Sequence, residues 1–364
     1  MYICTMNMFT DKGVNTTPID SLGEFGLIDH LTQGIKLKNK SSAFGIGDDA
    51  AVIDVGDKYQ LLSTDLLIEG VHFDLAYMPL KHLGYKSISV NVSDICAMNG
   101  DAKQITVGLA MSNRFTVEAL EELYSGIKLA CEHYEVDLVG GDTTSSTSGL
   151  MISVSVLGEV EKDKITYRRG AQINDLVICT GDLGSAYLGL QLLNRENQMF
   201  KDNPKMQPDL SGNEYVLKRQ LKPEAGIKYV KILKELGIVP TAMIDVSDGL
   251  SSEVLHISKS SNVGITIHED KIPIDYTAMN LANDFNLNPI TCALSGGEDY
   301  ELLFTVNQKH YDKLKKDFDF TILGFVTDIS EGNNFIANDS SSHPITAQGW
   351  DAIAIKKSKS QEEK

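Results

Sequence analysis

The sequence predicts an α/β (α+β) protein with two domains. Its 364 residues are enough for two hydrophobic cores. Short apolar runs typical of strands alternate with longer segments of helical spacing along most of the chain. The composition becomes strongly charged at residues 159–164, and we place the domain boundary there. The expected division is an N-terminal domain over 21–160 and a C-terminal domain over 161–355.

The N-terminal domain is expected to open with a helix over residues 21–33, with Ser21 as its N-cap. The longest helical pattern begins at Pro79, ends before Asn99-Gly100 and is rich in small residues that suit close packing. Its Asp94 would be costly if buried without a partner. Strands are expected over 59–63, 103–111, 136–140 and 150–158, and a further helix over 115–134.

The C-terminal domain repeats this alternation. Pro223 is expected at the first position of a helix over 223–236, with Gly237 just after its end. Residues 195–213 are polar and are expected to form an exposed excursion, and the charged tail over 356–364 is expected to be disordered. The remaining strands are predicted over 176–180, 242–245, 264–268, 301–306 and 321–326, and the remaining helices over 185–193, 249–260 and 308–317.

Composition excludes several classes of function. The formal net charge of −17, without a sizeable basic patch, argues against a nucleic-acid partner. The five cysteines are widely spaced and show no metal-ligand pattern, which favours reduced core residues and excludes a zinc site. Neither a run of 18 apolar residues nor a signal peptide is evident, so we expect a cytoplasmic protein without a membrane partner.

An acidic motif recurs along the chain. Gly-flanked aspartates or aspartates next to Ser and Thr occur in GIGDDA, STD, NVSD, VGGDTT and IDVSDG. Three of these motifs end a short apolar run, and strand ends can bring such side chains to one edge of a sheet. Hard oxygen ligands suit Mg²⁺, which binding sites usually complete with water and phosphate oxygens. The pattern predicts a metal–phosphate site, although any one aspartate could equally belong to a solvated loop.

Familiar nucleotide motifs do not explain this pattern. GIGDDA formally matches G-x-G-x-x-A, but it follows a basic polar loop rather than a strand, and its aspartates would repel a pyrophosphate. No P-loop sequence occurs. Arg168 could pair with a phosphate or be an ordinary surface arginine. His72, Glu298 and Trp350 have equally ordinary alternatives as a structural histidine, a solvated turn residue and a core side chain.

Taken in order, six motifs resemble those of the thiamine-monophosphate kinases: GIGDDA, STDLLIEGVHF, NVSDICAMNG, VGGDTTSS, IDVSDGL and LSGGEDYEL. The resemblance spans about residues 23–350. It implies a two-domain PurM-like fold in which the N-terminal halves of two subunits join their sheets into a homodimer. It also implies transfer of the γ-phosphate of ATP to thiamine monophosphate, with several Mg²⁺ ions, as the last step of thiamine diphosphate biosynthesis.

The same resemblance assigns roles to individual residues. The implied metal ligands are Asp49, Ser63, Thr64, Asp65, Asp94, Asp142, Asp245 and Asp248. The implied ATP contacts are Tyr124, Gly141, Asp142, Arg168 and Ser247. The implied contacts to thiamine monophosphate are His72, Glu298 and Trp350, with Glu298 offsetting a cationic ring and Trp350 stacking on one.

No catalytic base is expected, because a phosphate oxygen is already ionised at neutral pH and repulsion between two polyanions is the main obstacle. Two alternatives remain open at this point. One is another ATP-dependent member of the wider group, similar to aminoimidazole ribonucleotide synthetase. The other is an acidic metal-binding protein without catalytic activity.

Overall fold

The structure is a computed structural model that describes residues 17–18, 21–315 and 319–347. Residues 37–350 form one compact unit, and helix α1 (Gly23–Thr32) belongs to another, which we describe by itself. The predicted first helix is therefore present. Leu22 rather than Ser21 occupies its N-cap position, and no side-chain hydrogen bond caps it.

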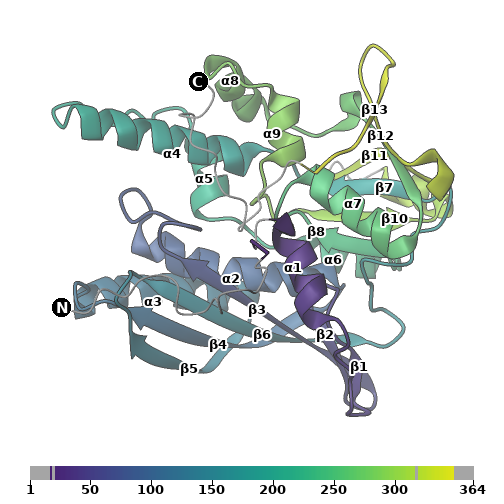
Figure 1. The fold of residues 1–364 in the computed structure, drawn as a ribbon, viewed down its shortest axis with the longest axis horizontal. Helices are drawn as coiled ribbons and strands as arrows, with labels where there is room; N and C mark the ends of the chain where they lie inside the picture. The colour runs from purple at the N-terminus through teal and green to yellow at the C-terminus, as the bar shows by residue number, and fades with distance from the viewer. Residues whose placement is uncertain (1–16, 19–20, 316–318, 348–364) are drawn as a thin grey trace. The chain divides into compact units, whose positions relative to one another are not determined.

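The N-terminal half of the compact unit is a six-stranded sheet covered on one face by two helices (Figure 1). The strand order is β1-β2-β3-β6-β4-β5, and all neighbours are antiparallel except β4 and β5. The strands are β1 (Ser42–Phe44), β2 (Ala51–Asp54), β3 (Lys58–Ile68), β4 (Asp101–Met111), β5 (Asp137–Ser145) and β6 (Met151–Glu161). The covering helices are α2 (Leu80–Ala97) and α3 (Val117–Tyr134).

Helices α2 and α3 pack at very short range because each presents a glycine to the other. A Cβ atom on Gly84 would lie 2.0 Å from the carbonyl oxygen of Leu123, and one on Gly126 would lie 1.8 Å from that of Lys81. No side chain fits at either position. The small residues of the 79–98 pattern therefore do serve close packing, as the sequence predicts.

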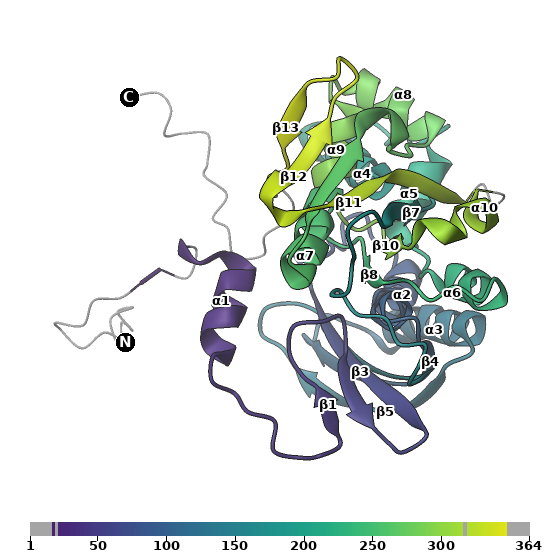
Figure 2. The same cartoon turned by 90° about the vertical axis from the view of Figure 1, so that its right-hand side faces the viewer.

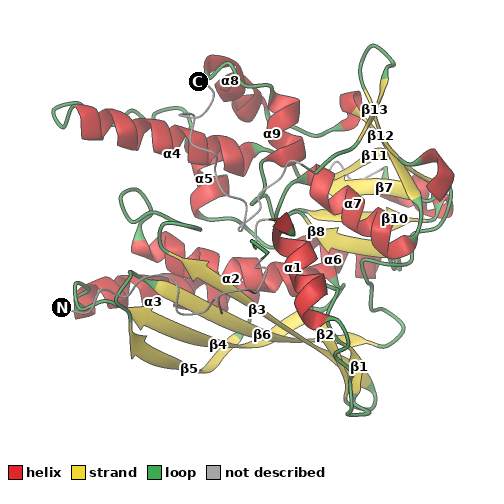
Figure 3. Ribbon diagram, in the orientation of Figure 1, coloured by secondary structure: helices red, strands yellow, loops and turns green. Residues whose placement is uncertain are grey.

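The C-terminal half contains a seven-stranded sheet in the order β13-β12-β9-β11-β7-β10-β8 (Figure 3). Only β12 and β9 run parallel. The strands are β7 (Leu176–Thr180), β8 (Ala242–Asp245), β9 (Gly264–His268), β10 (Leu302–Val306), β11 (Phe320–Thr327), β12 (Asn333–Ile336) and β13 (Ser342–Pro344). The helices are α4 (Ser185–Asp202), α5 (Glu214–Leu221), α6 (Ile227–Glu235), α7 (Leu250–Ser261), α8 (Tyr276–Asp284), α9 (Pro289–Ser295) and α10 (Tyr311–Leu314).

Both faces of the second sheet are covered, which is why β8 and β10 are continuous apolar runs. On one face, Phe304 packs into the same core as Tyr229 of α6 and Ile88 of α2. On the other, Ile244 packs with Val254 of α7. Helices α6 and α7 accordingly lie on opposite sides of this sheet in Figure 2. Helix α2 contacts both sheets and so links the two halves.

Several predicted boundaries are wrong because the elements extend beyond their apolar runs. β3 pairs with β6 along all eleven residues from Lys58 to Ile68, so Asp65 lies inside the strand and not at its end. β5 likewise runs through Asp142. Helix α4 continues to Asp202, because the residues after 193 are mostly good helix formers.

Two further expectations for the C-terminal half need correction. Helix α6 begins at Ile227, four residues after Pro223, whose carbonyl oxygen instead accepts a hydrogen bond from Ser89. The helix predicted over 308–317 is a 3-10 turn followed by the short α10. Within the described part of the chain, none of the helices has both the length and the apolar character needed to cross a membrane.

Candidate active site

Three aspartates from distant parts of the chain meet at one point. Asp49 lies in the loop before β2, Asp94 on α2 and Asp245 at the end of β8. One carboxylate oxygen of each lies within 4.8 Å of the corresponding oxygens of the other two. Three anions repel one another strongly at that distance in a buried site. A divalent cation held by hard oxygen ligands would remove the repulsion, so the cluster has the chemistry of a magnesium site.

Two serines orient two of these carboxylates. Ser63 Oγ on β3 donates to Asp94 Oδ2 over 2.6 Å, and Ser93 Oγ on α2 donates to Asp245 Oδ2 over 2.6 Å. Each hydroxyl thus fixes one oxygen of a carboxylate in the cluster. The sequence predicts a role for Ser63 but not for Ser93, which stands next to Asp94 on a buried helix.

Arg168 lies against the acid pair that precedes β2. Its Nη2 donates to Asp49 Oδ1 over 2.6 Å, and its backbone N–H is 3.2 Å from both carboxylate oxygens of Asp48. Asp49 Oδ2 is buried and has no hydrogen-bond partner among the residues that the structure describes. An anionic oxygen without a partner in a buried site is the expected signature of a cation ligand. The residues therefore fit a divalent ion.

Asp65 extends the cluster along β3. It lies two residues after Ser63 and so on the same face of the sheet. Its backbone N–H donates to Asn91 Oδ1 of α2 over 3.1 Å. Burial, followed by the charge of Asp49, raises the pKa of Asp65 to about 6. Asp65 thus shares the electrostatic environment of the other acids.

Burial and neighbouring carboxylates also act on Asp48, Asp94 and Asp245. Burial and then the charge of Asp49 raise the pKa of Asp48 to about 7 and that of Asp245 to about 7. Burial, then the charges of Asp65, Asp245 and Asp49, raise the pKa of Asp94. Without metal, the folded protein consequently holds protons that the unfolded chain would release.

We expect the metal-free protein to lose stability between about pH 4 and about pH 7. A carboxyl whose pKa is higher in the folded state binds more protons there, so the free energy of unfolding falls as pH rises. The fall begins near the ordinary value of 3.8 and ends near 7. Thermal melts in EDTA at a series of pH values measure it.

Saturating Mg²⁺ should remove most of this pH dependence, and the Asp94→Asn variant should weaken it in EDTA. A melting temperature in EDTA that is constant or rises between about pH 4 and about pH 7 would contradict the expected coupling.

The Thr64 hydroxyl does not face Asp94 as the Ser63 hydroxyl does. Successive side chains of a strand point to opposite faces, so Thr64 faces away from α2. Its Oγ1 donates to the carbonyl oxygen of Val154 over 3.0 Å and lies 3.1 Å from the Oγ of Ser155, which donates to it. The assignment of Thr64 as a metal ligand stays a prediction.

Asp142 is not brought to the aspartates within one chain. It lies opposite Gly108 of β4, on the edge strand β5, and β5 is three strands away from β3. At about 4.8 Å per strand the separation of these two strands is roughly 14 Å. Gly141 lies next to it on β5, and Tyr124 of α3 packs partly buried against the core. Their assignment to ATP stays a prediction.

The segment after β8 is hydrogen-bonded to the loop that contains Glu298. The backbone N–H of Glu298 donates to the carbonyl oxygen of Ser247 over 2.7 Å, and that of Tyr300 donates to Val246 over 2.8 Å. Asp248 is fixed at its backbone N–H, which donates to the buried Glu253 over 3.0 Å. Glu298 therefore lies beside the segment that leads out of the aspartate cluster.

Tyr300 gives a second indication of this proximity. Burial raises the pKa of its phenol, and the charges of Glu298, Asp65, Asp245 and Asp248 raise it further, in that order. The phenol is thus close enough to be influenced both by Glu298 and by the acids of the cluster.

The two remaining predicted contacts to thiamine monophosphate are His72 and Trp350. His72 lies in the loop after β3, where its Nδ1 accepts a hydrogen bond from the backbone N–H of Ile68 over 3.0 Å, which fixes the ring. Trp350 lies outside the described residues, as does the predicted tail over 356–364.

Sequence reasoning missed the polar residues buried along α2. Lys86, Asn91 and Ser93 are all at most 1% exposed. The sequence did contain a sign of these buried polar residues. The predicted helix is too apolar to be exposed to solvent, yet it includes a lysine and an asparagine. Such residues need partners when buried, and those partners come from other segments.

Comparison with known proteins agrees with this geometry. The family model "AIR synthase related protein, N-terminal domain" matches residues 47–160, a span that includes Asp49, Asp65 and Asp94. The thiamine-monophosphate kinase of Aquifex aeolicus is 35% identical over 332 residues, which are 91% of this chain and 98% of the relative. The chain belongs to the thiamine-monophosphate kinase family. The kinase of Bacillus subtilis is 33% identical over 338 residues, covering 90% of this chain and 99% of the relative.

Solved structures of this family extend the agreement to three dimensions. AaThiL complexed with AMPPCP and TMP has a TM-score of 0.77 and 34% identity, over 92% of this chain and 99% of that one. A more distant structure, the HypE–HypF complex, has a TM-score of 0.66 at 18% identity and covers 88% of this chain and 99% of that one, which shows a shared fold alone. The expected PurM-like fold of the thiamine-monophosphate kinases is confirmed.

Proposed function

We propose that this protein transfers the γ-phosphate of ATP to thiamine monophosphate and releases ADP and thiamine diphosphate. The observation that carries the proposal is the cluster of Asp49, Asp94 and Asp245, assembled from both halves of a chain that belongs to the thiamine-monophosphate kinase family. Further support comes from a relative that was solved with an ATP analogue and TMP together.

Mg²⁺ would be held by Asp49, Asp94 and Asp245. Asp65 lies beside them on β3, and Asp248 follows Asp245 by three residues in the chain. Bound Mg²⁺ would supply neutralising charge to phosphate oxygens. Ser63 and Ser93 hold two of the carboxylates in place by hydrogen bonds. Such pre-orientation matters because transfer between two polyanions depends mainly on positioning and on charge neutralisation.

Arg168 is the proposed cationic contact to the ATP phosphates. Its side chain is 21% exposed, and one of its terminal nitrogens is engaged by Asp49. The guanidinium has further N–H groups and can hold a carboxylate and a phosphate oxygen at the same time. Ser247, Tyr124, Gly141 and Asp142 stay as predicted nucleotide contacts.

No residue is needed to deprotonate the acceptor, since its attacking phosphate oxygen is already ionised. His72 and Glu298 are the proposed contacts on the acceptor side.

We also propose the homodimer and the domain division at about residue 160. The edge strand β5 has Leu138 and Val139 exposed at 38% and 62%, and β3 of the same sheet has Leu62 and Leu66 exposed at 42% and 45%. Open strand edges and apolar surfaces of this kind favour pairing with a second copy.

A cytoplasmic location stays a prediction from the sequence.

The function is tested by incubating the protein with ATP, MgCl₂ and thiamine monophosphate and separating the products. Equal amounts of ADP and thiamine diphosphate are expected. ADP without thiamine diphosphate, or no turnover at all, would rule the proposal out.

We expect activity to require free Mg²⁺ beyond the equivalent bound to ATP. Several clustered carboxylates provide more ligand charge than one MgATP complex needs. The measurement is the initial rate at fixed ATP while total Mg²⁺ is raised through and past the ATP concentration. A rate that saturates at one Mg²⁺ per ATP would count against a protein-held metal site.

A further inference from the structure

Lys86 is a buried cation near the proposed acceptor site. Its side chain is 1% exposed on α2, and its Nζ donates to Glu298 Oε1 over 2.7 Å. A second donation, over 3.4 Å, reaches the backbone carbonyl oxygen of Gln220 on α5. Burying an ammonium costs several kcal/mol unless a counter-charge compensates it. Glu298 is that counter-charge, although 212 positions separate the two residues in the chain.

Gln220 holds the other oxygen of the same carboxylate. Its Nε2 donates to Glu298 Oε2 over 2.8 Å. Both carboxylate oxygens are thus fixed, one by α2 and one by α5, while the Glu298 side chain remains 28% exposed. Glu298 also has a φ of 60°, which a non-glycine residue adopts only where its surroundings impose it.

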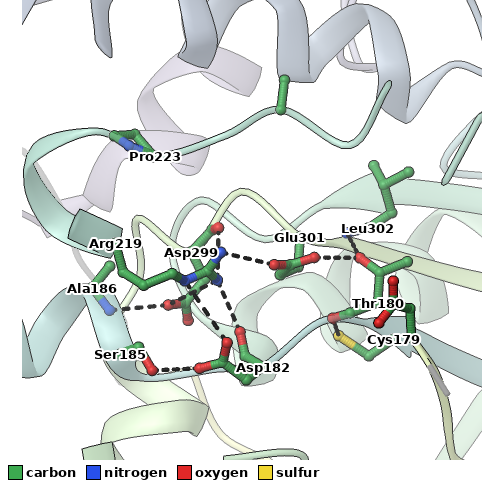
Figure 4. A network of polar contacts seen from close by, with 12 residues as sticks. Cys179, Thr180, Asp182, Ser185, Ala186, Arg219, Pro223, Asp299, Glu301 and Leu302 are labelled. Atoms are coloured by element: carbon green, nitrogen blue, oxygen red, sulfur yellow. Dashed lines mark hydrogen bonds and ion pairs between the residues drawn. The ribbon is translucent and has the colours of Figure 1, made fainter. Parts of the chain in front are cut away.

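Arg219, the residue before Gln220 on α5, fixes the backbone that follows Glu298. Its Nη1 donates to Glu301 Oε1 over 2.9 Å, and its Nη2 donates to the carbonyl oxygen of Asp299 over 3.2 Å. The Asp299 carboxylate in turn accepts hydrogen bonds from the backbone at the start of α4 (Figure 4). Neighbouring residues of α5 therefore hold successive parts of one loop.

Helix α2 also fixes the distance between Glu298 and the aspartates. Lys86 and Asp94 are eight residues apart on this helix, a rise of about 12 Å. One rigid element thus sets the position of the cluster with Asp94 and of the acceptor contact with Lys86. If Glu298 were not held by Lys86, its distance from the aspartates would no longer be fixed.

We propose that Lys86 and Gln220 are positioning residues that orient Glu298 to accept a hydrogen bond from the amino group on the pyrimidine ring of the acceptor. The proposal rests on the proposed function and specifies its acceptor site. Because Lys86 neutralises Glu298, the pair has no net charge to attract the thiazolium cation. What it offers are carboxylate lone pairs on the exposed side, and these select a hydrogen-bond donor.

The first test is the Lys86→Met variant of the full chain. The KM for thiamine monophosphate is expected to rise about tenfold or more, with the KM for ATP unchanged within about twofold. Glu298→Gln should have a similar effect, and the double variant should be no worse than the more affected single variant. Lys81→Met is the matched control, an exposed lysine on the same helix, and should leave both KM values unchanged.

The second test uses oxythiamine monophosphate, in which an oxygen function replaces the amino group. The wild type is expected to prefer thiamine monophosphate in kcat/KM by about tenfold or more, because the analogue leaves Glu298 without its donor. This preference should fall towards unity in Lys86→Met and in Gln220→Leu. If Lys86→Met does not fold, Gln220→Leu is measured instead.

Full retention of the preference in a folded variant, or effects of Lys86→Met and Glu298→Gln that multiply in the double variant, would overturn the positioning role. Those outcomes leave the proposed function intact. A wild-type protein that forms no thiamine diphosphate would overturn the function itself.

Discussion

Asp94→Asn is expected to abolish phosphate transfer and, at the same time, to make the metal-free protein more stable. The two effects have one cause. Asp94 lies with Asp49 and Asp245 within 4.8 Å, and its charge contributes both to cation binding and to repulsion when no cation is present. An amide keeps the shape and removes the charge, and it can still accept the hydrogen bond from Ser63 Oγ.

The expected loss in kcat is at least about a thousandfold, which corresponds to about 4 kcal/mol of transition-state stabilisation. Thermal melts in EDTA at pH 8 should show a higher melting temperature than that of the wild type, and the difference should shrink or reverse in saturating Mg²⁺. Asp57→Asn, which changes an exposed aspartate in the turn before β3, is the matched control and should change neither quantity. Normal turnover by Asp94→Asn would remove Asp94 from the proposed metal site.

Gly126→Ala is expected to destabilise the protein by about 3 kcal/mol or more. A Cβ atom there would lie 1.8 Å from the carbonyl oxygen of Lys81, which is backbone and cannot move aside without shifting α2. Gly84→Ala meets the carbonyl oxygen of Leu123 at 2.0 Å and should have the same effect. Because α2 also provides Asp94 and Lys86, residual activity should fall together with stability.

Urea unfolding followed by circular dichroism measures this effect. The matched control is Gly26→Ala in α1, another helical glycine, where a Cβ would meet nothing closer than Leu22 Cβ at 3.5 Å. Alanine has the higher helix propensity, so this change should be neutral or stabilising by up to about 1 kcal/mol. Equal behaviour of Gly126→Ala and Gly26→Ala would show that the helix pair is not as closely packed as described.

Local pattern was sufficient for most elements and for the chemistry. Helices α2 and α3 and strand β6 follow from the spacing of their apolar residues, which can be read from the sequence alone. The local pattern did not predict where strands end, because β3 and β5 continue through polar residues for as long as they pair with neighbouring strands. The motif STD likewise does not show that Ser63 and Thr64 point to opposite faces of the sheet, because the face of a residue depends on its place in the strand and not on its chemical type.

By itself, the sequence determined which groups are available: repeated aspartates beside Ser, Thr and Gly, a net charge of −17, and the motifs of a kinase family. These properties belong to the sequence itself and do not depend on how the chain folds. Only the tertiary structure decided which groups meet. It brought Asp49, Asp94 and Asp245 together, turned Thr64 away, and paired Lys86 with Glu298. Contacts across such separations arise from packing two halves of the chain against one helix, which no short-range pattern encodes.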